Sequence, residues 1–140
     1  MIEPRSITFK IDSRLDFVEV IGRAVNSLCT LTPLSEVDAY QAELCVVEAL
    51  TNAVNHACEN SSTGEIEVKM TLFSSKMMLE VSDNGEQFKN FSIPDLSFDP
   101  NAFEELPEGG MGLHIIGKVM DEVEYISQNN LNTLKMVKFY

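Results

Sequence analysis

Apolar and polar residues alternate along five short segments of the chain, and this two-residue period predicts β-strands. In the first segment, Ile7, Phe9 and Ile11 alternate with Thr8 and Lys10. A short turn separates the second segment from the third, so this pair is interpreted as an antiparallel hairpin. The fourth and fifth segments are interpreted as two closing strands across a turn at residues 128–132. The predicted strands span residues 6–11, 65–73, 77–82, 123–127 and 133–139.

Three further segments space their apolar residues by three or four positions, which predicts amphipathic helices over 14–28, 35–59 and 111–120. Ser35 follows a proline break and is the expected N-cap of the second and longest helix. Strands and helices do not alternate as they would in a doubly wound parallel sheet. We therefore predict an α+β fold formed by residues 1–140 as a single domain, a two-layer α/β sandwich whose mixed, mostly antiparallel sheet carries helices on one face.

Residues 85–110 show neither period and contain Pro94, Pro100 and Pro107. A stretch of this length without regular structure is uncommon inside a compact domain and is usually a functional lid or a disordered segment. Its charge is strongly acidic, since Lys89 is the single basic residue against six acidic ones. Any anion beneath such a lid would have to be neutralised by other groups.

Polar side chains gather on one face of the long predicted helix. Projected at about 100° per residue, Glu48, Asn52 and His56 share one sector, and apolar residues such as Leu50 and Val54 occupy the opposite one. A solvated helix face gives a similar stripe, but such faces favour Lys and Glu over Asn and His. Because the three residues are four positions apart, their side chains can converge on one ligand. A carboxylate beside an amide oxygen suits a general base next to a Mg²⁺ ligand.

Two glycine-containing turns are the other candidate sites. Asp83 and Gly85 follow a predicted strand, where they form either an ordinary turn or a carboxylate that accepts from the amino group of a base. Gly110 and Gly112 lead into the helix at 111–120, and such a junction presents free backbone N–H groups to a phosphate. Entry into a helix after a flexible loop explains these glycines equally well. Each turn alone is weak support for a site.

Taken together in chain order, these residues resemble the N, G1 and G2 boxes of the GHKL ATPases, the superfamily of gyrase-type ATPases and histidine kinases. The run G-M-G-L-H-I-I-G-K-V-M-D-E-V-E-Y, which starts at Gly110, is similar to the anti-sigma factor serine kinases of bacterial partner-switching systems. The resemblance covers nearly the whole chain. It implies the Bergerat ATP-binding fold, with ATP and Mg²⁺ as cofactors.

The resemblance implies roles at the phosphate end of the site. Glu48 is expected to accept the proton of an attacking serine hydroxyl, and Asn52 to bind the Mg²⁺ that bridges the ATP phosphates. The backbone around Gly110 and Gly112 is expected to hold the phosphates. His56 is expected either to contact phosphate or metal or to be hydrogen-bonded within the fold.

At the adenine end, the resemblance implies that Asp83 binds the amino group of the base and that Gly85 leaves room for the ring. Thr133, on the last predicted strand, is expected to support Asp83. The sequence departs from the family at Gln87, where the G1 box usually has a second glycine. It also has Glu108 and Gly109 where some relatives carry an arginine, which implies weak nucleotide affinity or slow turnover.

Composition limits the partners and the location. The chain has 140 residues and a formal net charge of −12, which excludes binding to nucleic acid or anionic membranes through positive charge as the main activity. The N-terminus lacks a signal-peptide pattern and no apolar run is long enough to span a membrane, so a cytoplasmic protein is expected. Cys29, Cys45 and Cys58 form no C-x-x-C pair, which favours reduced thiols over a zinc site. Cys45 is expected to be covered by neighbouring structure and to have no chemical role.

Three hypotheses for function follow. The first is an ATP-dependent serine protein kinase and anti-sigma regulator that phosphorylates a STAS-type anti-anti-sigma factor and sequesters a sigma factor. The second is an ATP-binding module that has lost phosphoryl transfer and acts by sequestration alone. The third, the catalytic piece of a histidine kinase, is disfavoured because the chain has no room for a helical dimerisation domain. Kinases of the first type often dimerise, so a homodimer is an expectation.

Overall fold

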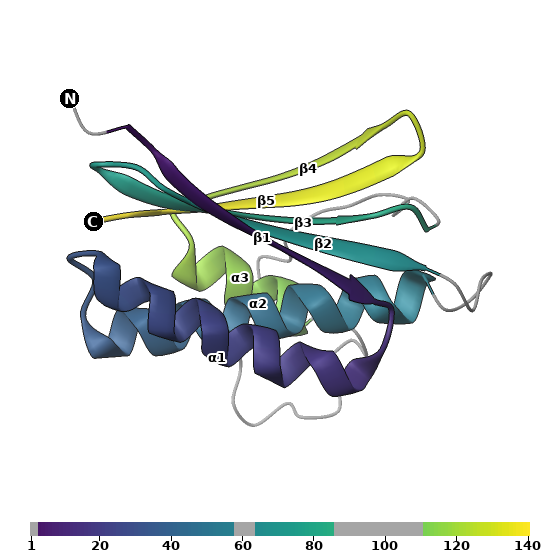
Figure 1. The fold of residues 1–140 in the computed structure, drawn as a ribbon, viewed down its shortest axis with the longest axis horizontal. Coiled ribbons are helices and arrows are strands. Elements are labelled where there is room, and N and C mark those ends of the chain that lie inside the picture. Colours follow the sequence, from purple (N-terminus) through teal and green to yellow (C-terminus); the bar gives the residue numbers. More distant parts are fainter. Residues whose placement is uncertain (1–2, 58–63, 86–110) are drawn as a thin grey trace, which may run out of the picture.

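The computed structural model describes residues 3–57, 64–85 and 111–140, except for the side chains of 56, 57 and 111. Figure 1 shows two layers, one formed by a sheet and the other by helices that cover one of its faces. The described strands are β1 (Arg5–Asp12), β2 (Glu65–Leu72), β3 (Lys76–Asp83), β4 (Glu122–Gln128) and β5 (Leu131–Phe139). The described α-helices are α1 (Val18–Leu28), α2 (Glu36–Ala57) and α3 (Met111–Val119).

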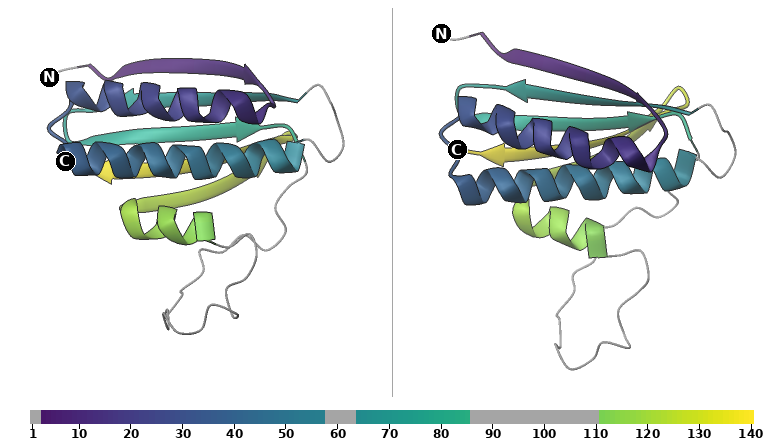
Figure 2. Two further views of the ribbon diagram at one scale, coloured as in Figure 1. Left: turned by 90° about the horizontal axis from the view of Figure 1, so that it is seen from below. Right: turned by 60° about the horizontal axis from the view of Figure 1, so that its bottom comes forward.

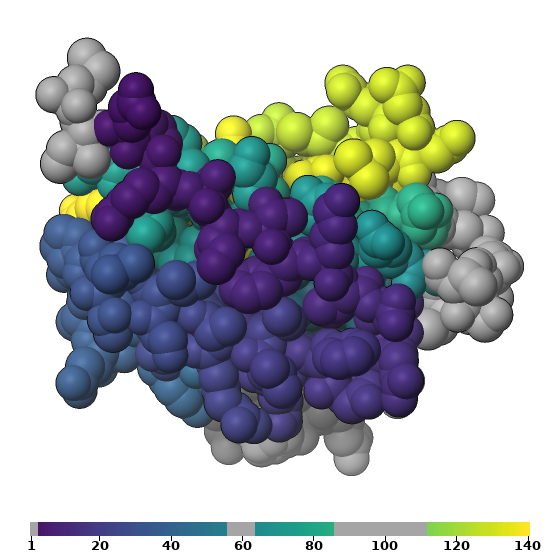
Figure 3. Space-filling view, viewed as in Figure 1, coloured from purple at the N-terminus to yellow at the C-terminus, as the bar shows by residue number. Residues whose placement is uncertain are grey.

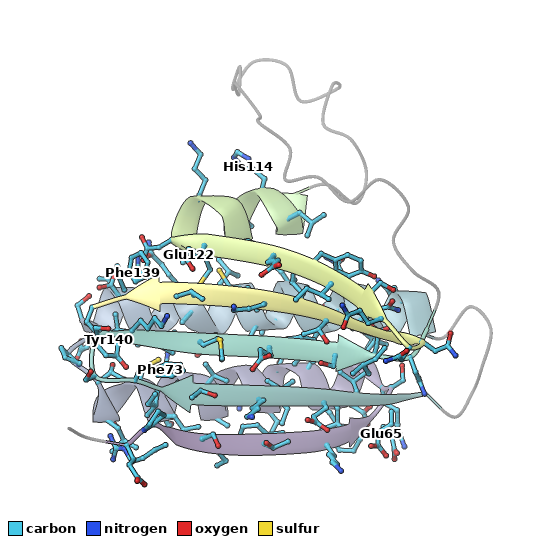
Figure 4. All side chains as sticks on the ribbon, turned by 90° about the horizontal axis from the view of Figure 1, so that it is seen from above. Glu65, Phe73, His114, Glu122, Phe139 and Tyr140 are labelled. Atoms are coloured by element: carbon cyan, nitrogen blue, oxygen red, sulfur yellow. The ribbon has the colours of Figure 1, made fainter. Side chains whose placement is uncertain are left out.

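The strands lie in the order β1-β2-β3-β5-β4. All four strand pairings among the described residues are antiparallel, so the predicted two-layer α+β fold is confirmed. Figure 2 shows the three helices side by side across the sheet, with α2 between α1 and α3. In the space-filling view, α1 and β1 form much of the surface nearest the viewer (Figure 3). Figure 4 looks onto the opposite sheet face, which the helices leave uncovered.

The predicted hairpin forms, the two closing strands also pair as an antiparallel hairpin, and both turns follow from local chemistry. In the turn between β2 and β3, the N–H of Phe73 donates to the carbonyl of Lys76 at 2.9 Å. Between β4 and β5, Asn129 and Asn130 adopt φ values of 54° and 63°. Two successive residues with positive φ define the type I′ turn that suits a two-residue hairpin, and Asn tolerates this conformation better than most residues.

The second helix is capped as predicted, and the first begins later than predicted. The Oγ of Ser35 accepts from the N–H of Asp38 at 3.1 Å, which satisfies one of the free donors at the start of α2. Short 3-10 turns at Leu15–Phe17 and Cys29–Leu31 flank α1. Such turns are common at helix ends. The turn at Leu15–Phe17 takes the place of the first turn of the helix predicted from residue 14.

Large apolar side chains fill the space between sheet and helices. Met70, Met77 and Met136 are fully buried, so these methionines fill the core. Cys29 and Cys45 are also buried, as predicted for Cys45. None of the helices in the described residues combines the length and apolar character that a membrane span requires.

The last turn of α3 is fixed to the end of β5. The Nζ of Lys138 donates to the carbonyl of Val119 at 3.1 Å and lies 3.7 Å from a carboxylate oxygen of Asp121. The same oxygen accepts from the N–H of Phe139 at 2.7 Å. A lysine at a helix C-terminus satisfies a free carbonyl and complements the negative end of the helix dipole. These bonds hold α3 beside α2.

The contact between α1 and α2 depends on a missing side chain. A Cβ at Gly22 would lie 2.7 Å from Cγ2 of Val47 and 3.3 Å from Cγ of Glu43. Close by, Nδ2 of Asn26 donates to Oε1 of Glu43 at 2.9 Å. The two helices therefore approach each other more closely than any residue larger than glycine would allow at position 22.

We expect Gly22→Ala to lower the free energy of unfolding by about 1–2 kcal/mol, because overpacking outweighs the gain in helix propensity. Urea unfolding measures the loss. The double variant Gly22→Ala with Val47→Ala should be about 1 kcal/mol more stable than the sum of the two single effects predicts. Gly117→Ala is the control, because Gly117 is exposed on α3 and its replacement should be neutral or stabilising. Additive effects of the substitutions at 22 and 47 would contradict the close contact.

Burial of the Cys29 and Cys45 thiols leads to a second prediction. It raises the pKa of Cys29 to about 11 and that of Cys45 to about 12, with the Glu48 carboxylate adding to the rise at Cys45. In a Cys58→Ser chain, neither thiol should react with an aromatic disulfide reagent at pH 8 until denaturant is added. Because unfolded thiols ionise near pH 9.0, stability should fall as the pH rises from there towards the folded values. Rapid labelling of the native chain would show that the core opens.

Candidate functional site

A small cavity is lined by residues of α2, α3 and the neighbouring strands β3, β5 and β4. Figure 2 shows α2 and α3 side by side on this part of the sheet. Two polar side chains, those of Asn52 and Asp83, line the cavity, and its volume is about 20 Å³, enough for about one water molecule. Its other walls are apolar or aromatic and come from Ala49, Ala53, Val81, Leu113, Tyr125 and Leu134. An apolar cavity with a few convergent polar groups is the usual form of a small-molecule site.

Asp83 is the last residue of β3 and is 9% exposed. Its Oδ1 accepts two hydrogen bonds, from the N–H of Gly85 at 2.9 Å and from Nδ2 of Asn132 at 3.2 Å. The first bond closes the turn that the residue pair predicts. Among the described residues, both hydrogen bonds to this carboxylate reach Oδ1, so Oδ2 can accept from a ligand in the cavity.

Asn132 is a residue of this site that sequence reasoning missed. It is 2% exposed, and its Nδ2 also donates to the carbonyl of Gly85 at 2.9 Å. Its Oδ1 accepts from the Oγ of Ser127 on β4 at 2.7 Å. The signal was present in the strand period, because residue 132 shares its parity with the core residues Leu134 and Met136.

The structure corrects the role expected of Thr133. In the register of β3 and β5, Asp83 pairs with Asn132 and Ser82 pairs with Thr133. Adjacent residues of a strand point to opposite faces, so Thr133 lies on the uncovered face. There its Oγ1 is 2.9 Å from the Oγ of Ser82. The side chain that supports Asp83 is therefore Asn132, and Thr133 is not brought to the cavity.

The polar stripe of α2 points partly into the site. Asn52 is half-buried and lines the cavity, whereas Asn55, one turn later, is exposed. Glu48 is half-buried and lies beside the first turn of α3. The apolar side of the helix, which includes Leu50 and Val54, is buried against the sheet, as the projection predicted.

Glu48 and Gly112 are in close contact. A Cβ at position 112 would lie 2.5 Å from Oε2 of Glu48 and 3.3 Å from its Cδ. Only glycine lets the first turn of α3 approach this carboxylate so closely. Backbone N–H groups and the positive end of a helix dipole lie at such a turn, next to Glu48 and close to the cavity that Leu113 lines.

Several predicted site residues cannot be placed. Gly110, Gln87 and the predicted lid lie outside the described residues. His56 lies in the last turn of α2, but its side chain is outside the described part. Of the predicted residues that are described, Asn52 and Asp83 share the cavity, Gly85 is bonded to Asp83, and Glu48 and Gly112 meet beside it.

The described residues fit an adenine nucleotide with Mg²⁺. The carboxylate oxygen of Asp83 that accepts no hydrogen bond from the described residues suits an amino group, and the apolar walls suit an aromatic ring. No group of three His, Cys, Asp or Glu that could bind a metal exists in the part of the chain that the structure describes. Asn52 supplies one hard oxygen, which suits Mg²⁺ because this ion keeps several waters and takes phosphate oxygens as further ligands.

The family model of the histidine kinase-like ATPase domain matches residues 11–138. The serine-protein kinase RsbW of Bacillus velezensis is 28% identical over 137 residues, covering 95% of this chain and 84% of the relative. RsbW of Bacillus subtilis is 26% identical with the same coverage. RsbW of Staphylococcus aureus strain JH9 is 28% identical over 138 residues, covering 95% of this chain and 86% of the relative.

Two solved structures share the fold. The RsbU and RsbW domains of Rv1364c from Mycobacterium tuberculosis give a TM-score of 0.68 at 13% identity, covering 96% of this chain and 32% of that longer one. The SiaB-SiaC complex from Pseudomonas aeruginosa gives 0.61 at 15% identity, covering 94% of this chain and 88% of the other. These matches confirm the resemblance to the serine kinases among the GHKL ATPases, and the chain belongs to the histidine kinase-like ATPase domain family.

Proposed function

We propose that this chain is an ATP-dependent serine protein kinase that phosphorylates a STAS-type anti-anti-sigma factor and acts as an anti-sigma regulator. The relatives named serine-protein kinase, which align over 95% of the chain, support the activity. The observation that carries the proposal is the carboxylate of Asp83, which faces a cavity with apolar walls and has both of its described hydrogen bonds on one oxygen.

In this proposal the base of ATP enters the cavity and its amino group donates to Asp83. The Tyr125 ring and the apolar side chains around the cavity contact the faces of the base, which fixes its plane. Because the cavity holds only about 20 Å³, a bound base widens it or extends beyond it. Asn52 lines the same cavity on the α2 side and would bind Mg²⁺, which neutralises phosphate charge.

The reacting end of the nucleotide is assigned to the place where α2 meets α3. A serine hydroxyl of the partner attacks the γ-phosphorus, the bond between that phosphorus and the β–γ bridging oxygen breaks, and ADP leaves. Glu48 accepts the hydroxyl proton. Its contact with Gly112 places this carboxylate beside the first turn of α3, whose backbone N–H groups suit phosphate oxygens. Transfer of this kind depends mainly on positioning and charge stabilisation.

The proposed protein partners rest on the net charge of this chain and on the proteins to which it is similar. A net charge of −12 gives the surface a strong preference for basic protein segments, which is compatible with sequestration of a sigma factor. The relative SiaB is known in complex with SiaC, which supports a dedicated protein partner for this fold. The same proposal includes a cytoplasmic location and assembly into a homodimer.

We expect Glu48→Gln to lower the rate of phosphate transfer to a STAS protein by about 10²- to 10⁴-fold, because the base is lost. ATP binding should change little. The assay uses Mg-ATP with labelled γ-phosphate and a STAS-domain protein from the same organism as the phosphate acceptor. Glu43→Gln is the matched control, since Glu43 lies on the same helix, is half-buried and bonds to Asn26 instead of facing α3.

Equal transfer by the Glu48→Gln and unaltered chains would remove Glu48 from the catalytic role. If the unaltered chain binds ATP but transfers no phosphate, the kinase proposal fails and the binding module that acts by sequestration takes its place. Calorimetry with ATP and Mg²⁺, run on the same preparations, separates these two results.

A further inference from the structure

Every polar atom of the Asn132 side chain is engaged inside the fold. Its two N–H groups donate to Oδ1 of Asp83 at 3.2 Å and to the carbonyl of Gly85 at 2.9 Å. Its oxygen accepts from the Oγ of Ser127 at 2.7 Å. These partners fix the orientation of the amide, because the carboxylate and the carbonyl can only accept. A buried asparagine with three such bonds is costly to replace by an apolar residue.

We infer that Asn132 is a positioning residue that sets the selectivity of the site for adenine over 6-oxopurines. The inference rests on the proposed function, because it assumes that Asp83 meets the base. Asn132 itself is not part of the cavity wall, whereas Asp83 is. Asn132 therefore acts on the base through Asp83 alone.

The bond geometry gives Asn132 this role. A free aspartate can rotate its carboxylate about χ2, so either oxygen can face a ligand. Here Gly85 and Asn132 donate to the same oxygen, Oδ1, and together they fix the carboxylate plane. Because Asp83 lines the cavity, we assign the acceptor for a ligand there to the other oxygen, Oδ2. A fixed acceptor favours a 6-amino group and repels a 6-oxo group more strongly than a mobile one does, because a mobile carboxylate turns away from the oxygen of the base.

The same amide ties together three strands. Asp83 is on β3, Asn132 is on β5 and Ser127 is on β4. Asn132 and Ser127 are directly opposite each other in the β4–β5 register, and Asp83 and Asn132 are opposite each other in the β3–β5 register. Ser127 holds the Asn132 oxygen, which leaves both N–H groups directed at Asp83 and Gly85. Tyr125, two residues before Ser127 on β4, lines the cavity itself.

The test compares the dissociation constants of ATP and ITP, which differ at the 6-position of the purine. We expect the unaltered chain to prefer ATP, and Asn132→Leu to reduce the preference by about tenfold through weaker ATP binding, the effect of losing one well-oriented hydrogen bond. Ser127→Ala should reduce the preference by a smaller factor, because the amide stays but is held less firmly. If Asn132 had a purely structural role, its replacement would weaken the binding of ATP and ITP equally and leave the ratio of their dissociation constants unchanged.

If the leucine variant does not fold, Asn132→Asp is tested in its place. This change keeps the size of the side chain but sets two carboxylates against each other, so the pair retains a proton at neutral pH. A protonated carboxyl can donate to a 6-oxo group, and the preference for ATP over ITP should fall further than in Asn132→Leu. Thr133→Val is the matched control, because it removes a hydrogen bond from the adjacent residue on the opposite face. The preference should stay unchanged in that variant.

The outcomes separate the two proposals. If the unaltered chain binds ATP no better than ITP, or binds neither, the adenine role of Asp83 fails and the inference fails with it. If the unaltered chain prefers ATP and the folded Asn132 variants keep the full preference, the inference is overturned while the proposed function stands. Circular dichroism and thermal unfolding of each variant establish which chains are folded.

Discussion

The hydrogen bonds to the carboxylate of Asp83 organise the site on which the proposed activity depends. β3 ends at this residue, and the turn that follows returns the N–H of Gly85 to Oδ1 while Asn132 donates to the same atom from β5. A polar side chain that is only 9% exposed needs such donors, because burying a polar group without a hydrogen bond is costly. Among the described residues both donors bond to Oδ1, so the bonds that make the burial tolerable also leave Oδ2 as an acceptor for a ligand.

Two glycines bring the helices to this acceptor. At Gly22, α1 approaches α2 closely enough to contact Val47 and Glu43, and at Gly112 the first turn of α3 reaches the carboxylate of Glu48. α2 is held from both sides by these contacts, with its apolar side against the sheet. The half-buried Asn52 and Glu48 are therefore positioned by the packing of α1 and α3 on either side of α2. The link from Lys138 to the last turn of α3 completes the frame at the other end of that helix.

The periodicity of the sequence was enough to predict the two layers, all five strands, the hairpins and the polar stripe of α2. It indicated which face of the strand Asn132 lies on but not its role, because the period does not show which residue a polar side chain on that face bonds to. The resemblance gave the role of supporting Asp83 to Thr133, which lies on the uncovered face of β5. The predicted strand began at 133, whereas β5 begins at Leu131. Tyr125 and Leu113 were not singled out from the sequence, because an apolar side chain that lines a cavity follows the same period as one that fills the core. The contact of Gly112 with Glu48 joins residues distant in the sequence, and only the packing of two helices reveals it.

The acidic composition of the chain limits how it can bind a nucleotide. A chain of net charge −12 is a poor general binder of anions, so a nucleotide has to be held by a local set of groups: the Asp83 acceptor, the apolar walls, Asn52 and the first turn of α3. The most direct test is a crystal structure of the chain with Mg²⁺ and a non-hydrolysable ATP analogue. The account predicts the 6-amino nitrogen of the base at hydrogen-bonding distance, about 2.7–3.2 Å, from the second carboxylate oxygen of Asp83, with the phosphates at the first turn of α3. A base bound elsewhere, with Asp83 still bonded only to Gly85 and Asn132, would contradict it.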